Sequence, residues 1–244
     1  MYRIRSKFYK TGDMVFISHL DLVRLLERAF RRGNIPISYT QGFNPHPIMA
    51  FATALGIGTS SEGEYMDIEV DEKIQLSKFM DSLNMVLPKG LEVITSKYIA
   101  KDNKSLMSII QYSSYTVKVV FQEKMKEEVV NNILCKFLSL EEIIEIKEKK
   151  NKNKFKKSYK NEIQEKNIRM QIKNLEVLRI QDNEVVLKML LATGSSGNLK
   201  PETVIKKLQE IMGLQIEPEK TRVHRLELLV EIEPKSLTPL DIAE

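Results

Sequence analysis

Hydrophobic and polar residues alternate along several short stretches of the chain, and this alternation predicts β-strands. In residues 2–9, YRIRSKFY, Ile4 and Phe8 fall on one face while basic side chains fall on the other. The same two-residue period recurs in residues 64–70, 114–121 and 221–232. Such a strand buries one face and leaves the other polar, so we expect a sheet with a covered side.

A second period, with hydrophobic residues three and four positions apart, predicts helices between these strands. The first helix runs from Ser18 to about Arg32: Ser18 and Asp21 form a capping box, and Gly33 supplies the stop. The other helices are expected at about residues 76–87, 124–138 and 201–213, the last opening on a proline at its favoured position.

In chain order the expected elements read β-α-β-β-α-β twice. We therefore expect an α+β fold made of two tandem ferredoxin-like (βαββαβ) units. The expected division is residues 1–105 for the first unit, residues 112–232 for the second with a lysine-rich insert at 147–166, and residues 233–244 as a tail.

The polar face of the first strand carries Arg3, Arg5 and Lys7, a positive platform that RNA can use. The ferredoxin-like plan places the strand with Asp67 and Glu69 beside it. Opposite charges on adjacent strands pair, so we expect ion pairs to occupy this face and make it structural.

Composition narrows the classes of function. Of the 244 residues 42% are hydrophobic and 29% charged, the net charge is +5, and no apolar run approaches the ~20 residues that span a bilayer. Cys135 is the single cysteine, which excludes internal disulfides and an iron–sulfur cluster held by this chain alone. We expect a cytoplasmic protein with no membrane segment and no cofactor.

The stretch YTQGFNPHP, residues 39–47, concentrates backbone constraint in one loop. Gly42 allows a positive φ, and the two prolines push Asn44 and His46 toward extended conformations. The interpretation we favour is a stiff binding loop that presents Phe43, Asn44 and His46. The alternative is a rigid connector between strands, with Phe43 buried as a plug.

Two basic segments provide further candidates for binding RNA. Arg24, Arg28 and Arg31 form a stripe on the first helix, suited to phosphates, and Glu27 is placed to pair with Arg31. The lysine-rich insert interleaves aromatic residues with lysines, and its candidate RNA contacts are Lys154, Phe155, Lys156 and Lys157. A solvated surface is the alternative for both segments.

Other polar residues suggest chemistry less directly. The loop Gly194, Ser195, Ser196 and Gly197 precedes a helix and is a candidate anion site, although it lacks the GK[ST] of a P-loop. His224 shares the apolar face of its strand with Leu226 and Leu228, which predicts a packed residue. No short ligand spacing joins the histidines, so no metal site is predicted.

The motifs SHLDL, QGFNPHP and SSEGEY, within residues 18–70, resemble the radical-SAM-linked proteins, a bacterial family of unknown function encoded beside or fused to a radical SAM protein. The resemblance continues through GSSGNLKPETVIKKL and TRVHRLELL and implies a radical SAM partner. The tandem plan is also similar to RAMP-type proteins that bind and cut CRISPR RNA, an analogy of fold alone.

Three functions follow as expectations. The first is a non-catalytic accessory protein to a radical SAM enzyme, binding or presenting an RNA substrate. The second is a metal-independent RAMP-like endoribonuclease that uses His19, Asp21 or His46 as acid, base or orienter. Residues two apart on a helix do not face each other, so the competing interpretation of His19 and Asp21 is a helix cap. The third is a protein-docking adaptor without RNA binding.

Overall fold

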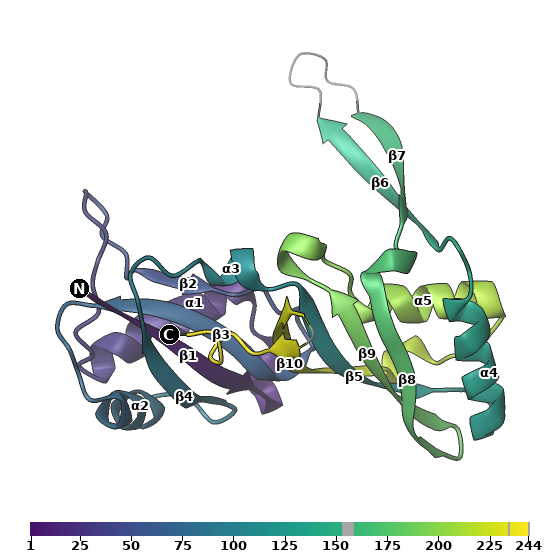
Figure 1. Cartoon of the computed structure of the whole chain (residues 1–244), viewed down its shortest axis with the longest axis horizontal. Helices are drawn as coiled ribbons and strands as arrows, with labels where there is room; N and C mark the ends of the chain where they lie inside the picture. Colours follow the sequence, from purple (N-terminus) through teal and green to yellow (C-terminus); the bar gives the residue numbers. More distant parts are fainter. Residues whose placement is uncertain (153–158, 234, 244) are drawn as a thin grey trace. The chain divides into compact units, whose positions relative to one another are not determined.

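The protein has a mixed α+β fold with a large, mostly antiparallel β-sheet (Figure 1). A computed structural model describes residues 1–152, 159–233 and 235–243. The chain forms two compact units. The first comprises residues 1–117, 192–198 and 222–244, and the second comprises residues 118–191 and 199–221.

The first unit begins with six elements in the expected order. These are β1 (Tyr2–Lys10), α1 (His19–Arg32), β2 (Met49–Phe51), β3 (Ser60–Val70), α2 (Leu76–Asn84) and β4 (Leu91–Ile99). Strand β1 lies between β4 and β3, β2 pairs with β3, and all three pairings are antiparallel. Shorter pieces of this unit are the 3-10 turns η1 (Gly12–Phe16) and η3 (Gly194–Ser196), and helix α3 (Leu106–Ile109).

Two late segments complete the first unit. Strand β10 (Arg222–Ile232) runs parallel to the start of β3 and also pairs with β5 (Tyr112–Val120) and β11 (Lys235–Leu237). The segment expected as a tail packs against this unit, because Leu240 and Ala243 are buried.

The second unit holds the end of β5 followed by α4 (Glu127–Leu138), β6 (Ile144–Lys152), β7 (Tyr159–Asn167), β8 (Ile172–Gln181), β9 (Glu184–Ala192) and α5 (Pro201–Met212). Strand β9 lies between β5 and β8. Strands β6 and β7 pair only with each other, as a separate two-stranded sheet. Two short 3-10 turns, η2 (Arg169–Gln171) and η4 (Pro218–Lys220), join these elements.

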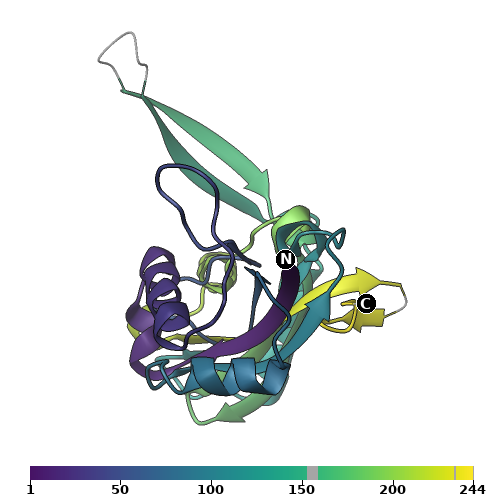
Figure 2. The same ribbon diagram turned by 90° about the vertical axis from the view of Figure 1, so that its left-hand side faces the viewer.

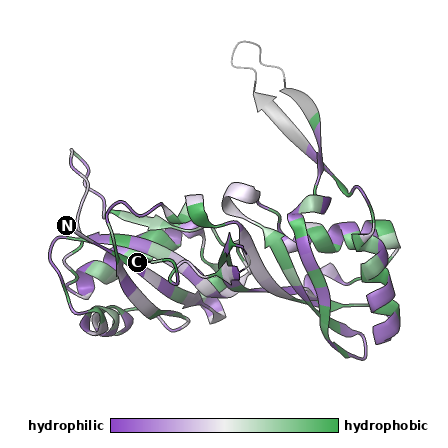
Figure 3. Ribbon diagram, in the orientation of Figure 1, coloured by the Kyte–Doolittle hydropathy of each residue, from purple (hydrophilic) through white to green (hydrophobic). Residues whose placement is uncertain are grey.

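Alternation sorts the side chains of the first unit between two cores. Ile4, Phe8 and Ile68 pack with α1 and α2. Tyr65 lies on the opposite face of β3 from Ile68 and packs with Leu240 in a second cluster. Figure 3 shows hydrophobic and hydrophilic residues succeeding each other along these strands. The sheet is therefore covered on both faces, whereas alternation alone predicts one buried and one polar face.

The expected ion pairs on the polar face of β1 are confirmed, with one change of partner. Arg5 lies directly opposite Asp67 and donates two hydrogen bonds to its carboxylate, of 2.8 and 2.9 Å. Lys7 lies opposite Tyr65 and pairs instead with Glu227 of β10, at 2.6 Å. This face is structural, because its cations are consumed within the unit.

Candidate functional site

The loop of residues 40–47 is a narrow excursion tied at its base by hydrogen bonds. The Thr40 amide donates to the His46 carbonyl at 2.9 Å, and the His46 amide donates to the Thr40 hydroxyl at 3.0 Å. Below them Tyr39 bridges to Pro47, and the Ile48 amide donates to the Ser38 carbonyl. Backbone contacts therefore hold the loop, which leaves its side chains free for other contacts.

The loop that carries Phe43 projects away from the strands of the first unit (Figures 1 and 2). The relative exposure of Phe43 is 111%, and every residue from Gln41 to His46 is exposed. Gly42 has φ of +126°, a backbone conformation that side chains other than glycine's rarely adopt. Phe43 is therefore not a buried plug, and this part of the connector interpretation is wrong.

Helix α1 starts as its sequence predicts. The Ser18 hydroxyl accepts from the Asp21 amide and donates to the Asp21 carboxylate at 2.6 Å, and this hydrogen bond lowers the pKa of Asp21. Leu22, Leu26, Ala29 and Phe30 are buried against the sheet. The opposite face therefore carries Arg24, Arg28 and Arg31, all exposed.

Glu27 joins the helix to the loop. Its carboxylate lies 3.9 Å from Nδ1 of His46, so the expected pairing with Arg31 is wrong. On a helix of 3.6 residues per turn, Arg24, Arg28 and Arg31 project within about 100° of Glu27. We call Arg24, Arg28, Arg31, Gly42, Phe43, Asn44 and His46 the loop–helix surface.

The three residues of the catalytic alternative have separate partners. Asp21 caps the helix with Ser18, His46 faces Glu27, and the His19 ring packs edge-on against Phe51 with centroids 5.1 Å apart. Each contact accounts for its residue without chemistry. The geometry supplies no argument for joint acid–base catalysis by these residues.

The remaining sequence candidates fall elsewhere. Lys154, Phe155, Lys156 and Lys157 lie outside the described residues. In the loop from Gly194 to Gly197, the Ser195 amide donates to the Ile110 carbonyl and the Gly197 amide to the Gly194 carbonyl. These two amides are therefore already hydrogen-bonded. The loop packs on α3, and α5 starts only at Pro201, so the geometry offers no argument for an anion site.

Sequence reasoning missed the seam, by which we mean residues 60–65 of β3 together with residues 222–229 of β10. Here Arg225, 4% exposed, donates to the buried Glu64 carboxylate at 2.9 Å, to the Thr53 hydroxyl and to the Tyr115 hydroxyl. Two further side chains of β10 also bond to β3. His224 bonds to the Ser60 hydroxyl, and Glu227 accepts from the Tyr65 hydroxyl. An arginine and a glutamate in otherwise buried strand positions were the available signal.

The expectation that His224 lies on the apolar face of its strand is wrong. The buried residues of β10 are Val223, Arg225, Leu228 and Val230, so the alternation changes phase between Arg225 and Leu228. His224 is half-buried, with 29% of its side chain exposed. A strict two-residue period therefore assigned it to the wrong side.

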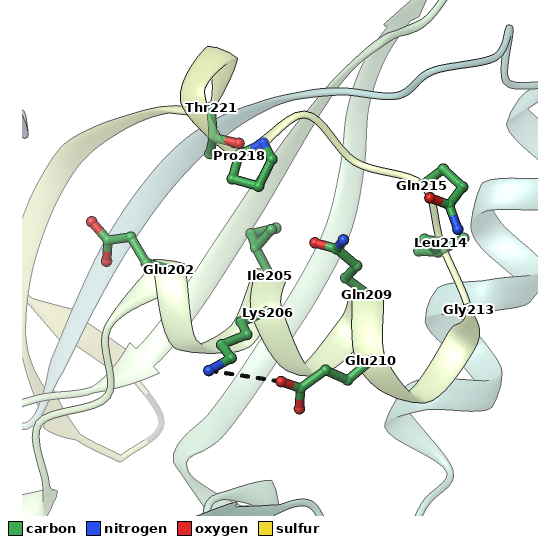
Figure 4. Close-up of a pocket in the computed structure, with 10 residues that line it drawn as sticks. All are labelled: Glu202, Ile205, Lys206, Gln209, Glu210, Gly213, Leu214, Gln215, Pro218 and Thr221. Carbon is green, nitrogen blue, oxygen red and sulfur yellow. Dashed lines mark ion pairs between the residues drawn. The ribbon is translucent and has the colours of Figure 1, made fainter. Parts of the chain in front are cut away.

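A cavity of about 570 Å³ lies between α5 and the segment that follows it (Figure 4). Ile205 and Gln209 point from the helix toward Pro218, and an ion pair of 3.8 Å joins Lys206 to Glu210 at the rim. Leu214 and Gln215 close the far end. No residue of the sequence-predicted site lines this cavity.

Among the described residues no group of histidine, cysteine, aspartate and glutamate side chains is arranged to hold a metal ion. No helix that the structure describes combines the length and apolar character needed to cross a membrane.

Comparison with solved structures finds distant likenesses. The chain is 10% identical to a chain in a Cbf5-Nop10-Gar1 complex, with a TM-score of 0.48, covering 92% of this chain and 48% of that one. A chain in an archaeal box H/ACA sRNP Nop10-Cbf5 complex is 9% identical, with a TM-score of 0.47 and coverage of 91% and 46%. The protein thus spans about half the length of these chains, and likenesses at this level carry no argument.

Sequence comparison is more decisive about family. No curated protein matches the chain. A family model described as an uncharacterized protein conserved in bacteria (DUF2344) matches residues 3–201. This match includes SHLDL, QGFNPHP and SSEGEY and covers most of the sequence. The chain therefore belongs to the DUF2344 family of uncharacterized bacterial proteins.

Proposed function

We propose that the protein is a non-catalytic accessory protein of a radical SAM enzyme and that it binds or presents an RNA substrate through the loop–helix surface. The observation that carries the RNA part is the complete exposure of Phe43 on a hydrogen-bonded loop beside three exposed arginines. A single exposed hydrophobic side chain is ordinary on a protein surface, so the proposal rests on the combination of the ring, its hydrogen-bonded loop and the neighbouring arginines.

The chemistry of this surface suits single-stranded RNA. Arginine side chains neutralise phosphates, and an exposed ring stacks on a base with about 1–3 kcal/mol per base. A loop already ordered by its own backbone loses little entropy on binding. Among the described residues neither Arg28 nor Arg31 takes part in an ion pair, so their charges are available.

The radical SAM partner rests on the family resemblance of the motifs. A radical SAM enzyme holds its cluster with three cysteines, and this chain has Cys135 alone. The given chain therefore does not hold such a cluster by itself, which favours an accessory role beside the enzyme. Docking on the enzyme without RNA is the alternative.

We also infer that both halves are ferredoxin-like, as in RAMP proteins. The strand order β4-β1-β3-β2 and the order β10-β5-β9-β8 each follow the same 4-1-3-2 scheme for a β-α-β-β-α-β series. The β6–β7 hairpin is then an insertion in the second series. An experimental structure in which either strand order differs would contradict this inference.

The RNA part is tested by fluorescence anisotropy with a short labelled single-stranded RNA of mixed sequence. Phe43→Ala should weaken binding by about 1–3 kcal/mol. Replacing Arg24, Arg28 and Arg31 by Gln should reduce the slope of log affinity against log salt by about 2. The matched control replaces the exposed Lys78, Lys101 and Lys104 by Gln, and equal losses in both triple variants would reject the loop–helix surface as the site.

The partner is tested by purifying tagged protein from its own cells before and after nuclease treatment. A radical SAM enzyme that remains after nuclease supports direct docking, and one that is lost with RNA supports an RNA bridge. Recovery of no radical SAM enzyme in either sample contradicts the accessory role. Cleavage of the labelled RNA without metal, abolished by His46→Ala, would establish the endoribonuclease alternative instead.

A further inference from the structure

A second cavity, of about 520 Å³, opens at one end of the first unit's sheet. Strand β1 ends there, and β3, β4 and β10 begin there, because β1 runs antiparallel to β3 and β4 while β10 runs parallel to β3. Its lining comes from all four strand ends and from η1. Residues distant in sequence therefore meet at this edge.

The SSEGEY motif reaches this cavity through one residue. Five of its six members have structural partners within the seam. Ser60 bonds His224, the Ser61 hydroxyl accepts from the Gly63 amide, Glu64 pairs with Arg225, and Tyr65 donates to Glu227. A Cβ at Gly63 would lie 2.5 Å from the Leu226 carbonyl oxygen, so the close approach of β10 requires glycine. The sixth member, Glu62, lines the cavity, and its nearest charged neighbour in the seam is His224 at 3.7 Å.

His224 is oriented toward the same space. Its Nδ1 lies 2.8 Å from the Ser60 hydroxyl, which fixes the imidazole ring. Its Nε2 lies 3.7 Å from the Glu62 carboxylate, too far for a hydrogen bond. A ligand group placed between or beside these two side chains therefore finds a nitrogen oriented by Ser60 and a carboxylate side chain that is 57% exposed and not hydrogen-bonded to that nitrogen.

Two opposite charges complete the lining without neutralising each other. Asp13 of η1 and Lys89 of the turn before β4 are both exposed and line the cavity. Within the described residues neither takes part in an ion pair or a hydrogen bond. The wall between them is stiff, because the Thr11 amide donates to the Gly90 carbonyl and a Cβ at Gly90 would lie 2.4 Å from the Thr11 carbonyl oxygen.

We propose that this cavity binds a small zwitterion of the α-amino acid class. The ammonium group of the ligand faces Asp13 and Glu62, and its carboxylate faces Lys89 and His224. A purely anionic ligand is repelled by Asp13 and Glu62 and a purely cationic one by Lys89, whereas a zwitterion can pair with charges of both signs. The volume lies in the range of small-molecule sites, about 300–1,000 Å³.

The test uses full-length protein without RNA, and saturation-transfer NMR with a mixture of the common L-amino acids. We expect one or a few to bind, with the dissociation constant of the best ligand raised about tenfold or more in Asp13→Asn and in Lys89→Gln. The matched controls, Asp81→Asn and Lys78→Gln on α2, should bind as the wild type does. Circular dichroism verifies that each variant is folded.

Several outcomes would overturn the site. They are the absence of binding by any amino acid, equal losses in the α2 controls, and equal affinity for the half-ligands acetate and butylamine. The result is separable from the proposed function, because replacing Arg24, Arg28 and Arg31 by Gln should leave amino acid binding unchanged while weakening RNA. Loss of both activities in that variant counts against a separate site.

Discussion

The seam buries its polar side chains and pairs them within the molecule, whereas the loop of residues 40–47 exposes its side chains to solvent. In the seam, Glu64 and Arg225 are buried, and their charges are satisfied by each other and by hydroxyl groups. In the loop, backbone atoms and one hydroxyl form the hydrogen bonds, while Phe43 and its neighbours face solvent. Both stretches carry the family resemblance, yet one is used to build the fold and the other is available to a partner.

This difference teaches where to look for function in an uncharacterized family. Where the side chains of a motif are paired inside the molecule, their contribution to the stability of the fold is enough to explain the motif. A motif held rigid by hydrogen bonds at its base, with most of its side chains exposed to solvent, is a better candidate for contacts with a partner. Substitutions in the two regions should therefore separate stability from binding.

The largest expected effect is at the buried ion pair. Arg225→Met removes the ion pair of the buried Glu64 carboxylate, which then keeps the electrostatic interaction with Lys10, and it removes the contacts to Thr53 and Tyr115. Breaking a buried pair costs about 3–5 kcal/mol. Urea unfolding measures this loss, and the exposed Arg28→Met is the matched control. A loss no larger than that of the control would mean that the seam is not a stabilising element.

The next effect is at Tyr65, whose hydroxyl donates to Glu227 at 2.8 Å. Tyr65→Phe should cost about 1.5–3 kcal/mol, the range for a hydrogen bond to a charged group. Burial, followed by the charge of Glu227, raises the pKa of Tyr65. The unfolded state then releases this proton at lower pH than the folded state does.

The pH dependence of unfolding sharpens this prediction. Because the folded pKa of Tyr65 is the higher one, its contribution is complete below the ordinary tyrosine value of about 10 and is lost as the pH rises above it. Unfolding between about pH 8 and pH 11 should show a steeper loss for the wild type than for Tyr65→Phe. The exposed Tyr2→Phe should keep the steep slope, and a flat wild-type slope would contradict the assignment.

A smaller effect is expected at the base of the loop. Thr40→Val removes the acceptor of the His46 amide and should cost about 0.5–1.5 kcal/mol, confined to the loop. Amide hydrogen exchange is the measurement, with faster exchange at His46. The Ile48 amide, bonded to the Ser38 carbonyl, is the internal control and should be unchanged. Equal acceleration at both amides would show that the loop is not an independent unit.

The smallest effect on folding is expected at the most exposed side chain. Phe43→Ala should change the free energy of unfolding by less than about 0.5 kcal/mol, because the ring contacts no core residue. Phe79→Ala, where the ring is 1% exposed, should cost about 3–5 kcal/mol in the same urea experiment. A large loss at Phe43 would remove the contrast between the loop and the seam.

Local patterns were enough to predict the early elements and the helix cap. Alternation located β1 and β3, and the Ser18–Asp21 spacing located the start of α1. The facing of Arg5 and Asp67 also followed from neighbouring strands in the expected plan. These features depend on contacts whose geometry is set within one strand pair or one helical turn.

Features that depend on distant pairing were not predictable. The pairing of Ser60 with His224 joins residues 164 positions apart, and no local period encodes its register. For the same reason Arg225 was not recognised as buried, and Glu27 was assigned to Arg31 rather than to a loop folded back beside it. The sequence likewise left open whether Phe43 is exposed or buried, because the hydrogen bonds at the base of the loop could not be inferred from it.

The root of the β6–β7 hairpin has a consequence for how this family can vary. Buried Ile143 and Ile168 join there by a hydrogen bond from the Ile168 amide to the Ile143 carbonyl, and the Asn167 side chain accepts from the amides of Ile143 and Arg169. Beyond this point, within the described residues, β6 and β7 pair with each other and with no other strand. Evolution can therefore lengthen, shorten or replace the hairpin as an interchangeable cassette, and an engineer can exchange it for a tag, while the second unit keeps its fold.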